Sequence, residues 1–301
     1  MIVLVSAPSN LGLRPPEPGT VPGAAKAPEA LREAGLFEGF AELGAAEAGV
    51  VLPGRYRDDA GPLRVRNQDA LVDHAVRLAD RIGTLLGDGK VPLVLGGDCS
   101  ILLGAGVALR RRGRHGLVHV DGHTDFRHPG NSDAVASVAG EDLAAVVGLH
   151  WPAVADIEGR SPYFRPEDAV HVGCRVDDEG YREASEALAD VVTAPEVMED
   201  LPGAVARVRR GVAGAGQGYW LHVDLDVLHP RVMPAVDSPD GGGLSPERLV
   251  ELLTALAPGA VGAQVTAFDP DLDAGGRYAR LVTEILLAGL RELGAARRVG
   301  A

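Results

Sequence analysis

Short apolar segments alternate with longer amphipathic segments along nearly the whole chain. The short segments have apolar residues at consecutive positions, which is typical of strands buried on both faces of a sheet. The longer ones repeat apolar residues every three or four positions, as in a helix with one buried face. The predicted strands are Ile2–Ser6, Val91–Leu95, Leu117–Asp121, Ala169–Val172, Val191–Thr193, Tyr219–Asp224 and Val261–Ala267. The predicted helices are Pro28–Phe40, Gln68–Leu86, Ile101–Arg112, Gly140–Leu149, Pro195–Arg210, Ser245–Leu256 and Arg277–Leu293.

This alternation predicts an α/β protein with a parallel sheet covered by helices on both faces. No shift in composition marks a boundary, so we expect residues 1–301 to form a single domain. Two polar segments, Pro8–Lys26 and His128–Ser137, come soon after predicted strands. We expect both to lie over the carboxyl edge of the sheet, where ligand sites of α/β proteins form.

Composition narrows the range of partners. The 29 Lys and Arg residues against 42 Asp and Glu give a net charge of −13, which argues against nucleic acid or an anionic membrane surface as the partner. No apolar run approaches the roughly 20 residues that span a bilayer, and the N-terminal segment lacks the basic start of a signal peptide. Two cysteines, Cys99 and Cys174, are too few for a disulfide framework. We therefore expect a cytoplasmic location.

Three polar motifs stand at the carboxyl ends of predicted strands: Gly96-Gly-Asp-Cys-Ser100, Asp121-Gly-His-Thr-Asp125 and Asp224-Leu-Asp226. In extended backbone, alternate residues point to the same side, so the acidic residues and the histidine should converge. Carboxylates crowded in a buried cleft repel one another unless cations compensate them. Oxygen and imidazole donors suit Mn²⁺ and, less specifically, Zn²⁺, Co²⁺ or Fe²⁺. More carboxylates are present than one ion needs, which favours two bridged ions.

Each motif alone has a simpler interpretation. Asp-x-Asp at a strand end is commonly a turn or a helix cap. For Asp-x-His-x-Asp alone, metal binding and a structural role are about equally frequent. Only their combination is specific. In this order, the three motifs resemble those of the arginase/agmatinase (ureohydrolase) superfamily. Supporting segments are Val232-Met-Pro-Ala-Val-Asp-Ser-Pro239 and Phe268-Asp-Pro270, and the resemblance covers nearly the whole chain.

The resemblance implies a three-layer α/β/α fold around a mainly parallel, roughly eight-stranded sheet. It also implies a site with two Mn²⁺ ions that hydrolyses a guanidino or related C–N bond. Asp121 and Asp224 would bridge the ions and hold a nucleophilic hydroxide between them. The implied metal ligands are Cys99, Asp121, His123, Asp125, Asp224 and Asp226. Asp177 and Asp178 lie where the family anchors the α-amino group of its substrate, although an ordinary acidic turn is the alternative.

Three positions depart from the family pattern. Cys99 replaces a usual histidine ligand, as in a subset similar to hydrolases of Nω-hydroxy-arginine; the alternative is a small packing residue. Ala267 aligns with a glutamate that grips the guanidinium group, and Ala139 aligns with a histidine. His128, in the same loop as Ala139, is the candidate to replace that histidine in catalysis, unless it is simply solvated.

We therefore expect a hydrolase of a small cationic guanidino substrate, such as a hydroxylated or N-substituted guanidine of the Nω-hydroxy-arginine type. The resemblance also implies a homo-oligomer. One alternative is a deacetylase-like amidohydrolase of the same fold with a single Zn²⁺. The other is a pseudoenzyme that keeps its metals for stability or for partner binding, for which Ala139 and Ala267 are the best evidence.

Overall fold

The computed structural model describes residues 1–296, and its centre is one eight-stranded sheet. Every pair of neighbouring strands is parallel, and the order is β2-β1-β3-β8-β7-β4-β5-β6. The strands are β1 (Ile2–Ala7), β2 (Ala46–Val50), β3 (Val91–Gly96), β4 (Gly116–Val120), β5 (Ala169–Val172), β6 (Asp190–Val192), β7 (Tyr219–Asp224) and β8 (Ala260–Thr266). The predicted fold class is confirmed.

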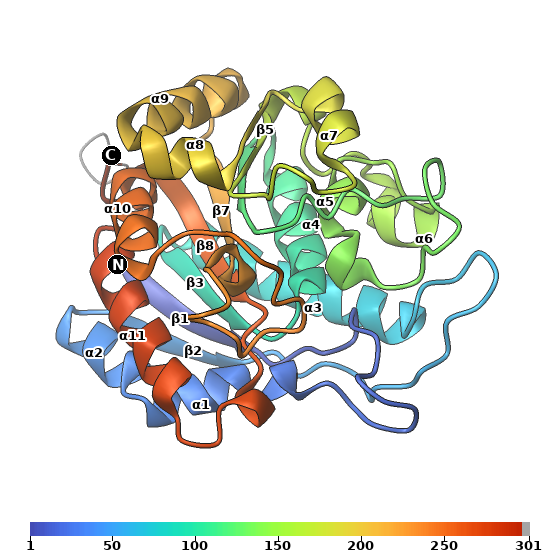
Figure 1. Cartoon of the computed structure of the whole chain (residues 1–301), viewed down its shortest axis with the longest axis horizontal. Coiled ribbons are helices and arrows are strands. Elements are labelled where there is room, and N and C mark those ends of the chain that lie inside the picture. Colours follow the sequence, from blue (N-terminus) through green and yellow to red (C-terminus); the bar gives the residue numbers. More distant parts are fainter. Residues whose placement is uncertain (297–301) are drawn as a thin grey trace.

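Helices cover both faces of this sheet (Figure 1). The helices are α1 (Ala27–Glu33), α2 (Leu36–Glu42), α3 (Gln68–Gly87), α4 (Leu102–Arg112), α5 (Asp142–Val146), α6 (Pro152–Ala155), α7 (Tyr181–Ala187), α8 (Ala194–Glu199), α9 (Leu201–Val212), α10 (Pro246–Leu256) and α11 (Arg277–Gly289). Helices α1, α2 and α8 to α11 contribute to one apolar core, and α3 to α7 contribute to the other.

The strands divide their side chains between these two cores. In β1, Ile2 and Leu4 belong to the first core, while Val3 and Val5 belong to the second. This follows from the two-residue repeat of a strand, which turns successive side chains to opposite faces. A strand with an apolar residue at every position is therefore the form that a sheet covered on both sides requires. Among residues 1–296, no helix is long and apolar enough to cross a membrane.

Several elements differ from the sequence prediction. The edge strand β2 was not predicted, since its residues are half-buried or exposed and lack a continuous apolar run. The predicted helix Pro28–Phe40 is two helices, because Gly35 between them has a φ of +88°. The predicted helix Pro195–Arg210 is also divided, at Asp200, whose carboxylate caps α9 by accepting from the Gly203 N–H. The short helices α6 and α7 were not predicted either.

The arrangement of strands sets the position of the polar motifs. Strands β3, β8, β7 and β4 lie side by side in the middle of the sheet, and the three motifs begin at the carboxyl ends of β3, β4 and β7. The loop that follows β1 packs directly on the first motif, where a Cβ on Gly97 would lie 1.7 Å from the Ser9 carbonyl oxygen. Glycine at position 97 therefore permits the close approach of these two loops.

Candidate metal centre

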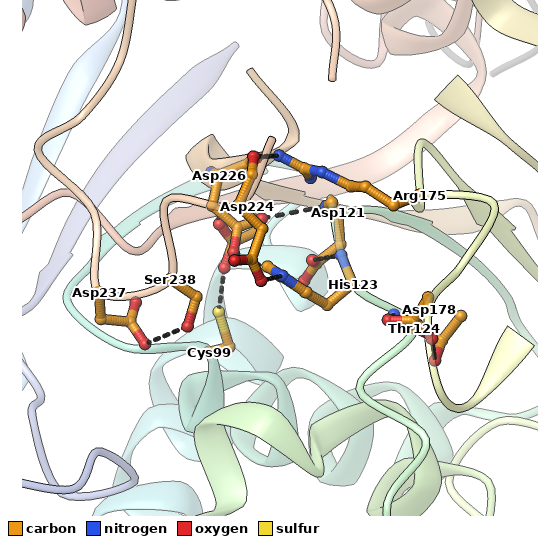
Figure 2. A network of polar contacts seen from close by, with 12 residues as sticks. Cys99, Asp121, His123, Thr124, Arg175, Asp178, Asp224, Asp226, Asp237 and Ser238 are labelled. Carbon is orange, nitrogen blue, oxygen red and sulfur yellow. Dashed lines mark hydrogen bonds and ion pairs between the residues drawn. The ribbon is translucent and has the colours of Figure 1, made fainter. Parts of the chain in front are cut away.

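The three motifs meet at one place above the sheet (Figure 2). Cys99, Asp121 and Asp224 are 3%, 1% and 4% exposed. One donor atom from each of these residues lies within 4.8 Å of the others. The same holds for a second group, formed by Asp121, His123 and Asp226. Asp121 belongs to both groups and therefore stands at the centre of the site.

Backbone amides hold the carboxylates of this site in place. Asp121 Oδ1 accepts from the His123 N–H at 2.7 Å, and Asp224 Oδ1 accepts from the Asp226 N–H at 2.7 Å. Asp226 Oδ1 accepts from the Gly122 N–H at 3.0 Å, which connects the second and third motifs. Each of these carboxylates thus uses one oxygen to fix its loop and has the second oxygen left for other contacts.

Asp125 joins the site from a strained backbone position. Its φ is +47°, in the left-handed region that few non-glycine residues occupy. One of its carboxylate oxygens lies within 4.8 Å of donor atoms of Cys99 and Asp142, and it also forms such a group with His119 and Asp121. All six residues predicted to bind metal therefore lie in overlapping groups of donor atoms, although their ligand roles stay a prediction.

Electrostatics at this site favour a bound cation. Burial, and then the negative charge of neighbouring carboxylates, raises the pKa of Asp121, Asp125 and Asp224 well above the usual carboxyl range. Burial and the charge of Asp224 raise the pKa of the Cys99 thiol in the same way. That thiol donates to Asp224 Oδ2 at 2.6 Å. A divalent cation would reverse these shifts, because it stabilises ionised oxygen and sulfur donors.

His123 is the positively charged group inside the cluster. Burial opposes its charge, but hydrogen bonds to Asp226 and Asp240 raise its pKa to about 10. Its Nδ1 lies 2.8 Å from Asp226 Oδ2, and its Nε2 lies 2.9 Å from Asp240 Oδ2. Burial would raise the pKa of Asp226, yet the hydrogen bond from His123 brings it below the ordinary value. A metal ion bound to His123 must displace a proton, so metal binding should release protons.

An unpaired oxygen also shows that the site fits a cation. Asp121 Oδ2 is fully buried and has no hydrogen-bond partner among residues 1–296. A buried carboxylate oxygen without a partner is costly, whereas coordination to a metal would satisfy it. The donor set of four carboxylates, one imidazole and one thiol is compatible with Mn²⁺, Zn²⁺, Co²⁺ or Fe²⁺.

A row of polar side chains crosses the sheet beneath this site. His171, His119, His222 and Gln264 are register partners on β5, β4, β7 and β8. The rings of His119 and His222 stack with centroids 4.4 Å apart. Burial lowers the pKa of all three histidines, to about 3 for His119, so these imidazoles are neutral at neutral pH. His119 Nε2 lies 3.2 Å from the buried Asp142 Oδ1.

The hydrogen bonds of Gln264 fix the tautomer of His222. The indole N–H of Trp220 can only donate, so the Gln264 oxygen that it contacts at 3.0 Å is the acceptor. The Gln264 amide nitrogen then donates to His222 Nδ1 at 2.7 Å, which leaves the imidazole proton on Nε2. That N–H faces Asp121 Oδ2 at 3.9 Å. His222 is therefore a potential donor to Asp121 and lacks the free Nε2 lone pair that a metal ligand needs.

A cavity of about 740 Å³ opens over the cluster. Its wall includes Cys99, His123, Asp125, Asp224 and Asp226, and the predicted substrate residues Asp177 and Asp178 also line it. The Asp178 carboxylate accepts from the Thr124 hydroxyl and from the Gly180 N–H, so it serves the loop of the second motif. Asp177 forms no such bond within the described chain.

His128 is not among the residues that line this cavity. Its Nε2 lies 2.9 Å from Glu183 Oε1, and its backbone N–H donates to Asn131. This geometry supplies no support for its predicted catalytic role, which stays a prediction. Sequence reasoning did not include Asp142, His171, Gln264 or Asp240, because none of them belongs to a recognisable motif, and it gave Asp237 no role although Asp237 lies in a segment that supports the resemblance.

Comparisons with known proteins place these features in a family context. The model of the arginase family matches residues 2–290. An arginase of Bacillus caldovelox is 32% identical over 254 residues, which cover 81% of this chain and 82% of that arginase. A formimidoylglutamase of Aeromonas salmonicida is 28% identical over 76% of this chain and 71% of that enzyme. The crystal structure of the Bacillus caldovelox arginase superposes with a TM-score of 0.85 at 27% identity, over 96% of this chain and 97% of that one.

The first prediction concerns pH. Since the folded-state pKa values of Asp121, Asp125 and Asp224 are raised, these groups stabilise the metal-free fold at low pH. That contribution to stability is complete below the unfolded-state carboxyl pKa of about 4. It is lost as pH rises through the raised pKa values of the folded state. Asp121→Asn should therefore stabilise chelator-treated protein relative to the parent, by about 1 kcal/mol or more at pH 7 and by less at pH 4. Urea unfolding at both values measures this, with the exposed Asp133→Asn as control. A gain at pH 4 that equals or exceeds the gain at pH 7 would contradict it.

The second prediction concerns Cys99. If its thiolate binds a metal, Cys99→Ala should lower the affinity of the site for one ion by about 10-fold or more and leave the other ion bound. The Co²⁺-loaded parent should show a sulfur-to-cobalt absorption band that this variant lacks. Cys174→Ala is the matched control, because Cys174 is also buried but belongs to the second apolar core. If Cys99→Ala has the metal content and the absorption spectrum of the parent, Cys99 is a packing residue.

Proposed function

This chain belongs to the arginase family, and we propose that it uses two divalent cations, Mn²⁺ by preference, to hydrolyse a C–N bond of a small cationic guanidine. Enzymes of this family are hydrolases that act on guanidino and amidino C–N bonds. The observation that carries the proposal is the overlap of two donor groups at Asp121, whose second oxygen is buried without a hydrogen-bond partner in residues 1–296. Two cations that share one carboxylate would satisfy that arrangement.

The bound cations would supply Lewis-acid chemistry, since they make a nearby water acidic enough to act as a nucleophile near neutral pH. The protein's own residues supply the rest. Asp121 belongs to both donor groups and Asp224 to the first, and together they would hold the two ions. Asp240 and Asp226 clamp the His123 ring from both nitrogens, so its orientation is set before any ligand arrives. Arg175 donates to the Asp226 carbonyl at 2.9 Å and fixes the third motif.

Two alanines shape the substrate end of the cavity. Ala139 and Ala267 both line it, at positions where the family pattern has a histidine and a glutamate. Methyl groups at these positions leave room beside the metal centre and remove one carboxylate that would grip an unsubstituted guanidinium. We therefore propose that the substrate is a hydroxylated or N-substituted guanidine, of which Nω-hydroxy-arginine is one example, and that Asp177 contacts a second cationic group.

The two alternatives are less well supported. A deacetylase-like amidohydrolase with one Zn²⁺ would leave Asp125 and the second Asp-x-Asp carboxylate without a role. A pseudoenzyme would explain Ala139 and Ala267, but it gives no reason for a cavity that opens onto the metal-ligand group. The cytoplasmic location and the homo-oligomer expected from the sequence remain predictions.

The third prediction tests the function directly. Protein loaded with Mn²⁺ is assayed for C–N hydrolysis against arginine, agmatine, Nω-hydroxy-arginine, N-substituted guanidines and formimino compounds. We expect a hydroxylated or N-substituted guanidine to have the highest kcat/KM, and arginine to turn over well below about 10 s⁻¹. Arginine as the best compound in the panel would contradict the substrate proposal. Hydrolysis of an acetyl-lysine substrate, or of nothing in the panel, would favour one of the alternatives.

A further inference from the structure

Most carboxylates around the cavity already have a partner in the protein. They are Asp98 with the Ser9 hydroxyl, Asp178 with Thr124, Glu179 with Arg127, Glu183 with His128 and Asn131, Asp240 with His123, and Asp224 and Asp226 in the metal-ligand group. Asp125 is also a predicted ligand. Within the described part of the chain, two other cavity carboxylates remain: Asp177, for which no side-chain partner is found, and Asp237, whose side-chain contact is a hydroxyl 3.4 Å away.

Asp237 is the one close to the metal centre. Its carboxylate has a single side-chain contact, the Ser238 hydroxyl of the next residue at 3.4 Å. Figure 2 shows Asp237 and Ser238 beside Cys99 and Asp224, with Asp178 on the opposite side of the ligand group. A cavity ligand that reaches the metals from the Asp178 side therefore has Asp237 at its far end.

The loop that carries Asp237 also lies next to Ala267. The Asp269 N–H donates to the Ala235 carbonyl at 2.8 Å, so residues 235–237 run beside the segment that follows β8. Ala267 has a φ of +70° and presents only a methyl group to the cavity. On the side of the cavity lined by Ala267, the described residues thus offer one carboxylate without a cationic partner, that of Asp237 on the neighbouring loop.

The surroundings of Asp237 are negative. Burial, and then the charge of Asp226, raises the pKa of Asp237 to about 6. Within residues 1–296, no positively charged side chain contacts this carboxylate. A cation placed there would gain a charge-assisted hydrogen bond, which is shorter and stronger than one between neutral groups.

We propose that Asp237 is the specificity residue that recognises the cationic guanidinium of the substrate, by accepting hydrogen bonds from its N–H groups while the metal centre lies on the other side of the reacting carbon. This rests on the function proposed above and adds to it the group that selects a charged substrate over a neutral one of the same shape. A planar guanidinium has paired N–H donors that match the two oxygens of a carboxylate. A ureido analogue has a carbonyl oxygen at the same place, which Asp237 would repel.

The test compares Asp237→Asn with the parent, both loaded with Mn²⁺. We expect metal content to stay the same, and binding of guanidino ligands to weaken by about 10-fold to 100-fold, the range for losing one hydrogen bond to a charged group. Affinity for the matching ureido compounds should stay the same or rise, because Asp237→Asn removes the repulsion of their carbonyl oxygen. Glu179→Gln is the control, because it removes one charge from the exposed rim of the same cavity.

A second variant separates a binding role from a structural one. Ala267→Glu placed in the Asp237→Asn background should restore at least part of the preference for guanidino over ureido ligands, since it returns a carboxylate to the same wall. The proposal is overturned if Asp237→Asn keeps the parent's preference, or if it loses a metal ion and so proves to be a ligand. Binding is measured by calorimetry and does not need turnover. A parent that binds guanidinium through Asp237 but hydrolyses nothing would refute the proposed function alone, and a parent that binds no guanidinium would refute both.

Discussion

Repulsion between buried carboxylates is the constraint that organises this protein. The central strands of a sheet covered on both faces deliver Asp121, Asp125, Asp224 and Asp226 to one edge, where burial limits the screening of their charges by water. Two unit charges about 4 Å apart interact by about 4 kcal/mol at an effective dielectric constant near 20. The fold can bear such a cluster only with compensation from backbone amides, from the charged His123 and from bound cations.

The layer beneath the cluster supports it without adding charge. Three buried histidines and Gln264 lie in register on four neighbouring strands. Burial keeps the histidines neutral. Gln264 is itself oriented by Trp220, so a packing residue of the second core determines where the His222 proton lies. Asp121, the proposed bridging carboxylate, thus has two kinds of neighbour: cations that would neutralise it, and the neutral His222 imidazole, whose Nε2 lies 3.9 Å from its unpaired oxygen.

The sequence was sufficient for seven of the eight strands, since these are mostly apolar, and for the position of the six proposed ligands, since they fall in three short motifs at strand ends. It could not reveal β2, which is half exposed and lies at the edge. Asp142, His171 and Gln264 were also beyond it, because their place near the site depends on strand register and on the position of α5, which no local pattern encodes. The proposed role of Asp237 was beyond it for the same reason, because that role depends on the position of its loop beside Ala267.

The most direct test of the central claim is anomalous X-ray scattering from crystals of the protein loaded with Mn²⁺. We predict two peaks close enough to share Asp121, one beside His123 and Asp226 and the other beside Cys99 and Asp125, with Asp224 between them. One peak alone, or peaks that do not contact Asp121, would contradict the claim that crowded carboxylates at this sheet edge are built to hold a pair of cations.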